Sequence, residues 1–415
     1  MLTKLNIFWQ DFKKCLTFVP LPILALIMYM GLRSTSFTSD GELHMFNGVF
    51  HPAYLGWYDF VLGYSVIITV FFGRIKIDIK DVFFLLTLLV IIFLSWTSVY
   101  ESNSDFILDG MVCFLRFSLV FILGNSLVYH LGIETSESIL TALFLILVLS
   151  SVFVFLLQAG IDSRLYAAGM TSPSSSQVSV IVASIAYLRK NYLLLVISVL
   201  FTLLTFSRFS LIFFVVLIVA YHKKLLSWTI LKNVVLMIGF LAIVILGLIK
   251  FGGEGYEVVF ASRSSSEEFS NLNGRTEIWS SAFDSLQSGR IPLFGIGFHT
   301  TPSLLKEMNL VSFNESDETA KPIPHFHSIL WEYGLGMGIS SFLIFFYLFK
   351  RVWQTFYYSC YPSFFIFAFF LLSQSVDFTF YVPKEIVIWS LMLGMAEGQW
   401  RYNSISVNKK NIASE

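Results

Sequence analysis

Six basic side chains, four arginines and two histidines, are the candidates for chemistry in this chain. They are Arg116, Arg164, Arg208, Arg275, His325 and His327. A guanidinium group can bind an anion through paired hydrogen bonds. An imidazole can accept or donate a proton near neutral pH. These residue types would suit anion binding and proton transfer, and each position also has a structural interpretation.

The arginines have local alternatives to a functional role. Arg208, in TFSRFSLIFF, could bind an anion in an outward cavity or extend its head group to the membrane surface. Arg116, in MVCFLRFSLVF, carries a charge that costs about 2.5–3.5 kcal/mol at mid-membrane, so it should face a cavity or a partner helix. Asp109 is two helical turns away, too far for direct contact. Arg275 could cap a short helix or form a salt bridge with it, and Arg164 has the same structural alternative.

The histidines lie in KPIPHFHSILWEYGLGMG, where a polar segment gives way to an apolar one. A helix through this stretch would place His327 on one face with Trp331, Gly334 and Gly338. Gly334 and Gly338 form a small-xxx-small pair suited to close helix contact. A helix beginning at 325 would turn the His325 ring about 200° away from that face. The histidines could be structural or could act on a substrate.

Several common reaction classes lack their signatures. The chain has no P-loop, dinucleotide fingerprint, HExxH or GxSxG sequence, and its three cysteines lack metal-ligand spacing. ATP-driven transport and hydride transfer therefore have no support. A formal net charge of zero gives no sign of a nucleic-acid partner.

Composition indicates a membrane protein. Hydrophobic residues make up 56% of the chain, charged residues 13%, and the mean hydropathy is +0.74. Soluble domains carry about 25% charged residues. A chain of this length cannot hide so much apolar surface from water, so lipid must surround part of it.

Twelve apolar runs are long enough, or nearly so, to cross about 30 Å of hydrocarbon as helices. They lie near 17–32, 58–73, 82–100, 107–131, 138–160, 175–188, 191–207, 209–222, 227–250, 326–349, 357–376 and 383–399. The sequence thus predicts an all-α polytopic integral membrane protein of about twelve transmembrane helices.

Lysines and arginines cluster in alternate connections, which orients the chain. All but one of the connections on the same side as the N-terminus are basic, the exception being 132–137. Both termini are therefore predicted to be cytoplasmic. The expected organisation is helices 1–9 in 1–250, a large periplasmic loop in 251–324, and helices 10–12 with a cytoplasmic tail in 325–415.

The predicted loop contains signs of structure. NLNGRTEIWSSAFDSL suggests a short amphipathic helix with Ile278, Trp279, Phe283 and Leu286 on one side. PLFGIG, which follows, suggests a tight turn.

Four segments together resemble the bacterial O-antigen polymerase and O-antigen ligase superfamily. They are RLYAAGMTSPSSS, TFSRFSLI, GRTEIWSSAF with IPLFGIGFHT, and PHFHSILWEYGLGMG. The resemblance covers roughly 160–350, and Ser172 replaces the usual asparagine of the first segment. The N-terminal spans resemble the family only in hydropathy.

The resemblance implies a GT-C-like transferase that acts at the periplasmic face on glycans linked to undecaprenyl diphosphate. It implies no nucleotide, cofactor or metal. Arg208 and Arg275, supported by Arg164, would bind the donor diphosphate, and His327 would act on the acceptor hydroxyl. His325 and Arg116 are the fallback residues for the site. A chain-length regulator and a flippase are possible partners.

Two reactions share this family. A polymerase joins one lipid-linked repeat unit to another, whereas a ligase transfers the finished glycan to lipid A-core. The ligase pattern is matched at Gly338 but not at Ser341, which favours a polymerase. A polysaccharide flippase is a third hypothesis, against which the large loop argues.

Overall fold

The computed structural model of the chain is helical. It describes residues 78–97, 104–157, 172–205, 207–222, 275–289, 291–300, 328–376 and 383–414, and every regular element within these ranges is a helix. The predicted spans 17–32, 58–73 and 227–250 lie outside the described residues. The twelve-span count and the extent of the large loop therefore stay predictions.

The described helices account for nine of the predicted apolar runs. Their bounds are α4 (Ile79–Trp96), α5 (Ser104–Leu157), α6 (Ser172–Leu188), α7 (Tyr192–Leu204), α8 (Arg208–Tyr221), α12 (Arg275–Gln287), α14 (Ile329–Met337), the 3₁₀ turn η5 (Gly338–Ser340), α15 (Ser341–Tyr357), α16 (Tyr361–Val376) and α17 (Pro383–Ser414). Three stretches, Ile79–Trp96, Gly110–Glu134 and Ile329–Tyr357, are long and apolar enough to cross a membrane, and further apolar helices are shorter. This arrangement fits a polytopic membrane protein.

Two breaks divide long helical stretches. Gly132 has φ 81° and ψ 175°, so α5 is two helices joined by a kink, close to the predicted connection at 132–137. Gly338, with φ 55°, separates α14 from α15 within the predicted span 326–349. Positive φ favours glycine because a Cβ atom would be strained there.

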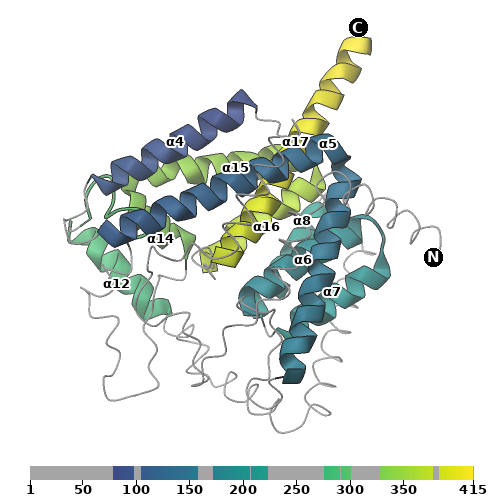
Figure 1. Ribbon diagram of the computed structural model, residues 1–415, viewed down its shortest axis with the longest axis horizontal. Helices are drawn as coiled ribbons and strands as arrows, with labels where there is room; N and C mark the ends of the chain where they lie inside the picture. The colour runs from purple at the N-terminus through teal and green to yellow at the C-terminus, as the bar shows by residue number, and fades with distance from the viewer. Residues whose placement is uncertain are drawn as a thin grey trace.

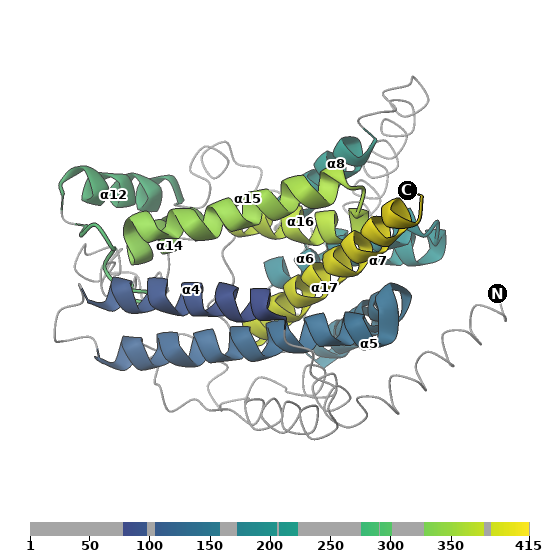
Figure 2. The same ribbon diagram turned by 90° about the horizontal axis from the view of Figure 1, so that it is seen from above.

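The most extensive helix pair joins α5 and α17. Gly124 of α5 faces Gly394 of α17, Gly398 lies against Asn125 and Val128, and a Cβ on Gly394 would overlap the carbonyl of Phe121. The two backbones can approach this closely because small residues line the contact. In Figures 1 and 2 α17 lies beside α5, and its C-terminal end projects beyond the other described helices in Figure 1.

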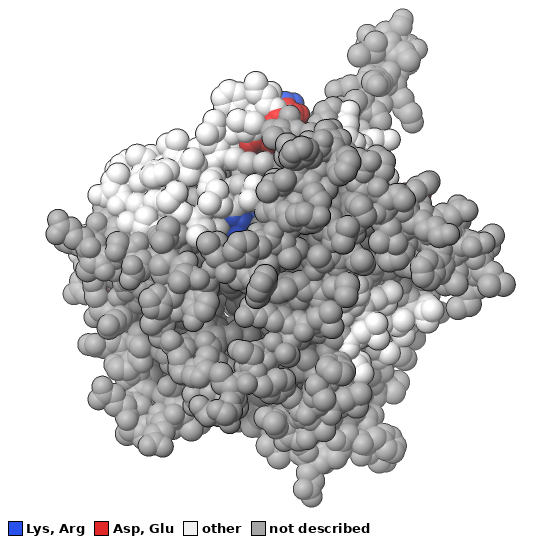
Figure 3. All heavy atoms as spheres, in the orientation of Figure 1, with Lys and Arg blue, Asp and Glu red and all other residues white. Residues whose placement is uncertain are grey.

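On one flank α4 runs beside α15, with the rings of Phe84 and Tyr347 stacked at 4.4 Å (Figure 2). The outward faces of both helices expose large apolar side chains, among them Phe83, Leu86, Val90, Phe342, Phe346 and Trp353. In Figure 3 the described part of one face is mostly uncharged, and acidic and basic atoms gather toward its upper edge. Such faces suit contact with lipid.

The structure confirms the short helix predicted after the large loop's polar segment, as α12. Its buried residues are Ala282 and Ser285, whereas Phe283 and Leu286 are 48% and 51% exposed. At these two residues the predicted apolar side therefore does not pack against the described part of the chain. Small side chains face the protein because α12 lies against α14, and the larger apolar ones point outward.

Candidate functional site

Two of the signature segments meet where α6 and α8 begin. The hydroxyls of Ser176 and Ser210 lie 2.6 Å apart, and those of Ser207 and Ser210 lie 2.8 Å apart. All three serines are buried. Arg208 is the first residue of α8, so this serine junction fixes the backbone from which its side chain starts.

The connection that carries Arg208 is short. Thr205 caps the end of α7, and its hydroxyl donates to the carbonyl of Thr202 at 2.7 Å. Helix α8 begins only three residues later. A hairpin this short leaves Arg208 at the end of two packed helices, a position suited to an anion near the helix N-terminus.

The other two signature segments are joined by backbone hydrogen bonds. The N–H groups of Ile296 and Gly297 donate to the carbonyls of Leu335 and Gly336 at 3.0 and 2.8 Å. The N–H of Ile339 donates back to the carbonyl of Leu293 at 2.9 Å. The segment 292–297 therefore docks against the break between α14 and α15.

Glycine is required at this contact. Gly295 has φ 85° and Gly338 has φ 55°. A Cβ on Gly295 would overlap the carbonyl of Gly336, and one on Gly338 would overlap that of Leu293. We call this backbone contact the glycine lock. It explains in physical terms why both segments carry closely spaced glycines.

Helix α4 holds the next residues of the same segment. The N–H of Phe298 donates to the hydroxyl of Ser95 at 2.9 Å, and the indole N–H of Trp96 donates to the Phe298 carbonyl at 2.9 Å. The hydroxyl of Thr300 donates to the carbonyl of Gly297 at 2.7 Å. The segment 291–300 is thus fixed at both its α4 and its α14 contacts.

Arg116 is the one candidate residue whose side chain the structure describes. It is buried in α5, and its charge acts on the ring of His299. The two ring nitrogens of His299 are shielded from solvent. Burial, and then the charge of Arg116, lower the pKa of His299 to about 3, so the ring is neutral at physiological pH.

A layer of buried amides extends from the serine junction into the bundle. The Nε2 of Gln374 and the indole N–H of Trp389 both donate to the Oε1 of Gln177, at 3.1 and 3.2 Å. Glu385, in the first turn of α17, and Glu332, in the first turn of α14, are also buried. Sequence analysis overlooked these residues; the available signal was a lone polar group inside each apolar run.

The histidine prediction needs correction. Helix α14 begins at Ile329, and Ser328 before it is extended, with φ −151° and ψ 128°. The helix predicted from 325 therefore begins later, at Ile329, and the placement of His327 lies outside the described residues. A Cβ on Gly334 would meet nothing within 4 Å, so the Gly334–Gly338 pair does not mediate a close helix contact.

The remaining candidates are placed only in part. Arg208 and Arg275 begin α8 and α12, but their side chains lie outside what the structure describes. Arg164, His325 and His327 lie outside the described residues. The convergence of these side chains stays a prediction.

An apolar cavity lies between α4, α5, α14, α15 and α16. It holds about 670 Å³ of atom-free space. Phe298, from the anchored segment, lines it, and so do Tyr347 and Leu348 in α15. Cys113, Phe114 and Phe117 of α5 also face it, so the cavity runs along the helices and away from the glycine lock.

Residues 193–346 match the family described as O-antigen ligase (Wzy_C). The match begins in α7 and ends in α15, and it includes the serine junction's Ser207 and Ser210 and the whole glycine lock. No curated protein gives a significant match to the chain. This match supports the resemblance of the chain to the O-antigen polymerase and ligase superfamily.

Proposed function

We propose that this glycan-transferring enzyme polymerises O-antigen repeat units carried on undecaprenyl diphosphate, at the periplasmic face of the inner membrane. The observation that carries the proposal is the contact between signature segments far apart in sequence. The serine junction joins the first two segments, and the glycine lock joins the other two. Each pair is thus held together by the fold, which supports a functional role for both contacts.

The proposed chemistry is displacement at the anomeric carbon of the donor sugar. An acceptor hydroxyl oxygen bonds to that carbon as the bond to the diphosphate oxygen breaks. The diphosphate leaves with the electron pair, and His327 takes the hydroxyl proton. Arg208 and Arg275, with Arg164 in support, stabilise the departing diphosphate through paired hydrogen bonds.

The apolar cavity supports a lipid-linked donor. It begins beside Phe298, in the segment between α12 and α14, and its lining is almost entirely aliphatic and aromatic. An isoprenoid chain buried there would gain about 25 cal/mol for each Å² of apolar surface removed from water or headgroups. Its diphosphate would then lie near the anchored segment, where Arg116 could assist.

The polymerase and the ligase of this family differ in the acceptor that receives the glycan. The description of the matched family favours a ligase, so transfer to lipid A-core is the second candidate. Ser341, where the ligase pattern is not met, donates its hydroxyl to the Gly338 carbonyl at 2.7 Å and so closes the turn of the glycine lock. We favour the polymerase on this departure from the pattern.

A deletion strain would separate these reactions. Lipopolysaccharide with one repeat unit on core is expected for loss of a polymerase. Bare core with accumulated lipid-linked polymer would instead indicate a ligase. Purified protein that fails to convert lipid-linked repeats into polymer or ligated product, while moving them across vesicle membranes, would establish a transporter.

The sidedness of the proposal rests on the basic connections. We expect a fusion near Glu315 to be active as alkaline phosphatase, with both termini in the cytoplasm. A cytoplasmic reporter active at the same position would overturn the periplasmic assignment.

A further inference from the structure

A second pocket, with different chemistry, lies where α4 begins and α15 ends. It holds about 710 Å³ of atom-free space and is open to the surface. Its lining residues come from α4, α15 and α17; they are Lys80, Lys350, Arg351, Gln354, Glu397, Trp400, Arg401 and Ser404. Four of the eight are cations and one is an anion. We call it the cationic pocket.

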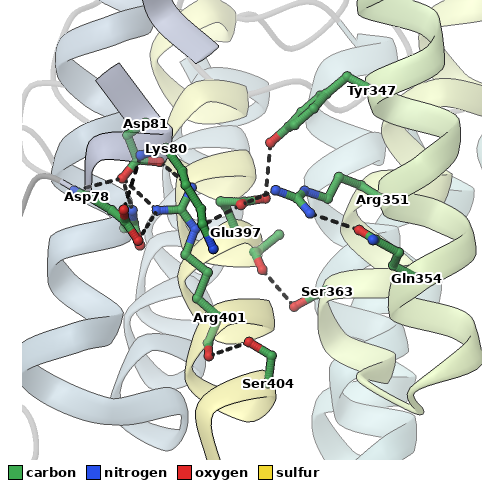
Figure 4. Close-up of polar contacts among 12 residues, drawn as sticks. Asp78, Lys80, Asp81, Tyr347, Arg351, Gln354, Ser363, Glu397, Arg401 and Ser404 are labelled. Carbon is green, nitrogen blue, oxygen red and sulfur yellow. Dashed lines mark hydrogen bonds and ion pairs between the residues drawn. The ribbon is translucent and has the colours of Figure 1, made fainter. Parts of the chain in front are cut away.

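The carboxylates beneath this pocket are already fully engaged (Figure 4). Glu397 accepts from Arg351 at 2.5 Å, from Arg401 at 2.9 Å and from the Tyr347 hydroxyl at 3.0 Å. The guanidinium of Arg401 also forms a bidentate pair with Asp81, at 2.5 and 2.8 Å. Glu397 and Asp81 are buried, so the two arginines and two carboxylates balance one another.

The rim carries charge beyond this balance. Lys80 and Lys350 are both exposed, and among the described residues neither ammonium group forms an ion pair. The nearby Asp78, whose side chain is 40% exposed, lies 3.5 Å from Arg401 and caps α4. Within the described part of the chain, two lysines and one exposed carboxylate thus lie near the rim, which leaves an excess of positive charge there.

The floor of the pocket also offers hydrogen-bond donors. The Nε–H of Arg351 is shielded from solvent and has no hydrogen-bond partner within the described part of the chain. Trp400 and Ser404, from successive turns of α17, also line the pocket, and the Ser404 hydroxyl already donates to the carbonyl of Arg401 at 2.8 Å. A buried guanidinium donor without an acceptor is costly, and an anionic oxygen would satisfy it.

The position of the pocket indicates where such an anion would come from. Ile79 and Phe83 on α4, and Phe349 and Trp353 on α15, expose 58–69% of their surface beside the two lysines. Apolar side chains next to basic ones at a helix end are typical of the boundary between hydrocarbon and headgroups. A headgroup in the pocket would leave its acyl chains along these faces.

We propose that the cationic pocket binds a phosphodiester anion, supplied by the membrane as the headgroup of an anionic phospholipid. Lys80 and Lys350 attract the phosphate, and Arg351 donates to it. By the distribution of basic connections, the lipid belongs to the cytoplasmic leaflet. This site is separate from the proposed glycan-transfer site, so it stands whether or not that reaction is the right one.

Native mass spectrometry of the purified, delipidated full-length protein can test the site. Phosphatidylglycerol and phosphatidylcholine with identical acyl chains would be titrated separately, and inorganic phosphate would be added as a competitor. We expect one phosphatidylglycerol to be retained in preference to phosphatidylcholine. Each lysine near a membrane contributes roughly five-fold in affinity, so Lys80→Gln and Lys350→Gln should each weaken retention about five-fold, and together about twenty-five-fold.

Matched variants control for charge and for folding. Lys190→Asn removes one exposed lysine from the turn between α6 and α7 and should leave retention unchanged. The Lys80→Arg, Lys350→Arg double variant keeps both charges and should retain the lipid. Equal retention of the two lipids by the unmodified protein would overturn the proposal, as would full retention by the double glutamine variant. Displacement by millimolar inorganic phosphate would overturn the assignment to a lipid.

Discussion

The backbone N–H of Phe298 donates to the hydroxyl of Ser95 across 2.9 Å, although 203 positions separate the two residues. This bond ties the segment after α12 to the end of α4. The segment carries half of the glycine lock and one wall of the apolar cavity. The proposed transfer site therefore depends on a helix that precedes the matched family region.

The first prediction tests this anchor. Ser95→Ala leaves the buried N–H of Phe298 without its acceptor, which should lower stability by about 1–3 kcal/mol and increase proteolysis within 291–300. Thermal unfolding in detergent and limited proteolysis would measure both. Ser118→Ala is the control, because that buried hydroxyl donates only within its own helix, to Phe114 at 2.8 Å. Equal effects of the two variants would contradict a specific anchor.

The second prediction concerns the glycine lock. Gly295→Ala and Gly338→Ala each place a Cβ at positive φ and against a backbone carbonyl, so both should abolish activity or folding. Gly334→Ala, in the same α14 helix, meets open space and should be nearly neutral. Glycan ladders at matched membrane levels would show the contrast. Normal glycan ladders from both Gly295→Ala and Gly338→Ala would refute the requirement for glycine in the lock.

The third prediction concerns the arginines. Arg208→Ala should eliminate polymer, and Arg208→Lys should not restore it, because a point charge cannot reproduce the bidentate fork. Arg275→Ala should behave similarly. Arg189→Lys, at the distant pair with Glu137, serves as a control and should preserve activity. Full activity of Arg208→Ala at normal expression would rule out diphosphate binding.

The fourth prediction concerns His327. A positioned base typically contributes 10²–10⁴-fold, so His327→Ala should leave an inserted, folded protein that is nearly inactive. The His327→Gln variant distinguishes two roles of the ring. Glutamine can still form a hydrogen bond but cannot accept a proton, so activity in this variant would indicate a hydrogen-bonding role. Ladders from both variants, compared with His325→Ala, would decide. Normal glycan ladders from both His327 variants would exclude a catalytic role for His327. Loss of polymer in His325→Ala alone would assign that role to His325.

The fifth prediction is a pH dependence. The pKa of His299 is about 3 in the folded protein and about 6.5 when solvated, so the unfolded chain binds the extra proton first. Stability is fully present above pH 6.5 and should fall as the pH is lowered toward 3. His299→Gln should flatten this acid limb in thermal unfolding, whereas His130→Gln, at an exposed position, should not. An unchanged limb in His299→Gln would refute the assignment.

Hydropathy predicted the nine apolar runs that the structure describes because each is apolar over at least ten residues, although only three of the stretches are long enough to cross a membrane. It could not reveal the break at Gly338, since the apolar run continues through it and only the docked segment 292–297 explains it. The later start of α14 has the same origin: Ser328 before it is extended, which periodicity cannot detect. Gln177 and Gln374 escaped notice because a buried amide pair is defined by contact between distant helices.

The glycine contact between α5 and α17 also constrains how the protein is made. Gly124 is synthesised long before Gly394, and within the described part of the chain the surface that it offers to Gly394 is covered by α17, the last described helix. During translation, the face of α5 around Gly124 must therefore contact lipid or other helices until α17 has been synthesised. Final assembly must wait for the C-terminal helix, so truncation there would leave an inserted but unassembled chain.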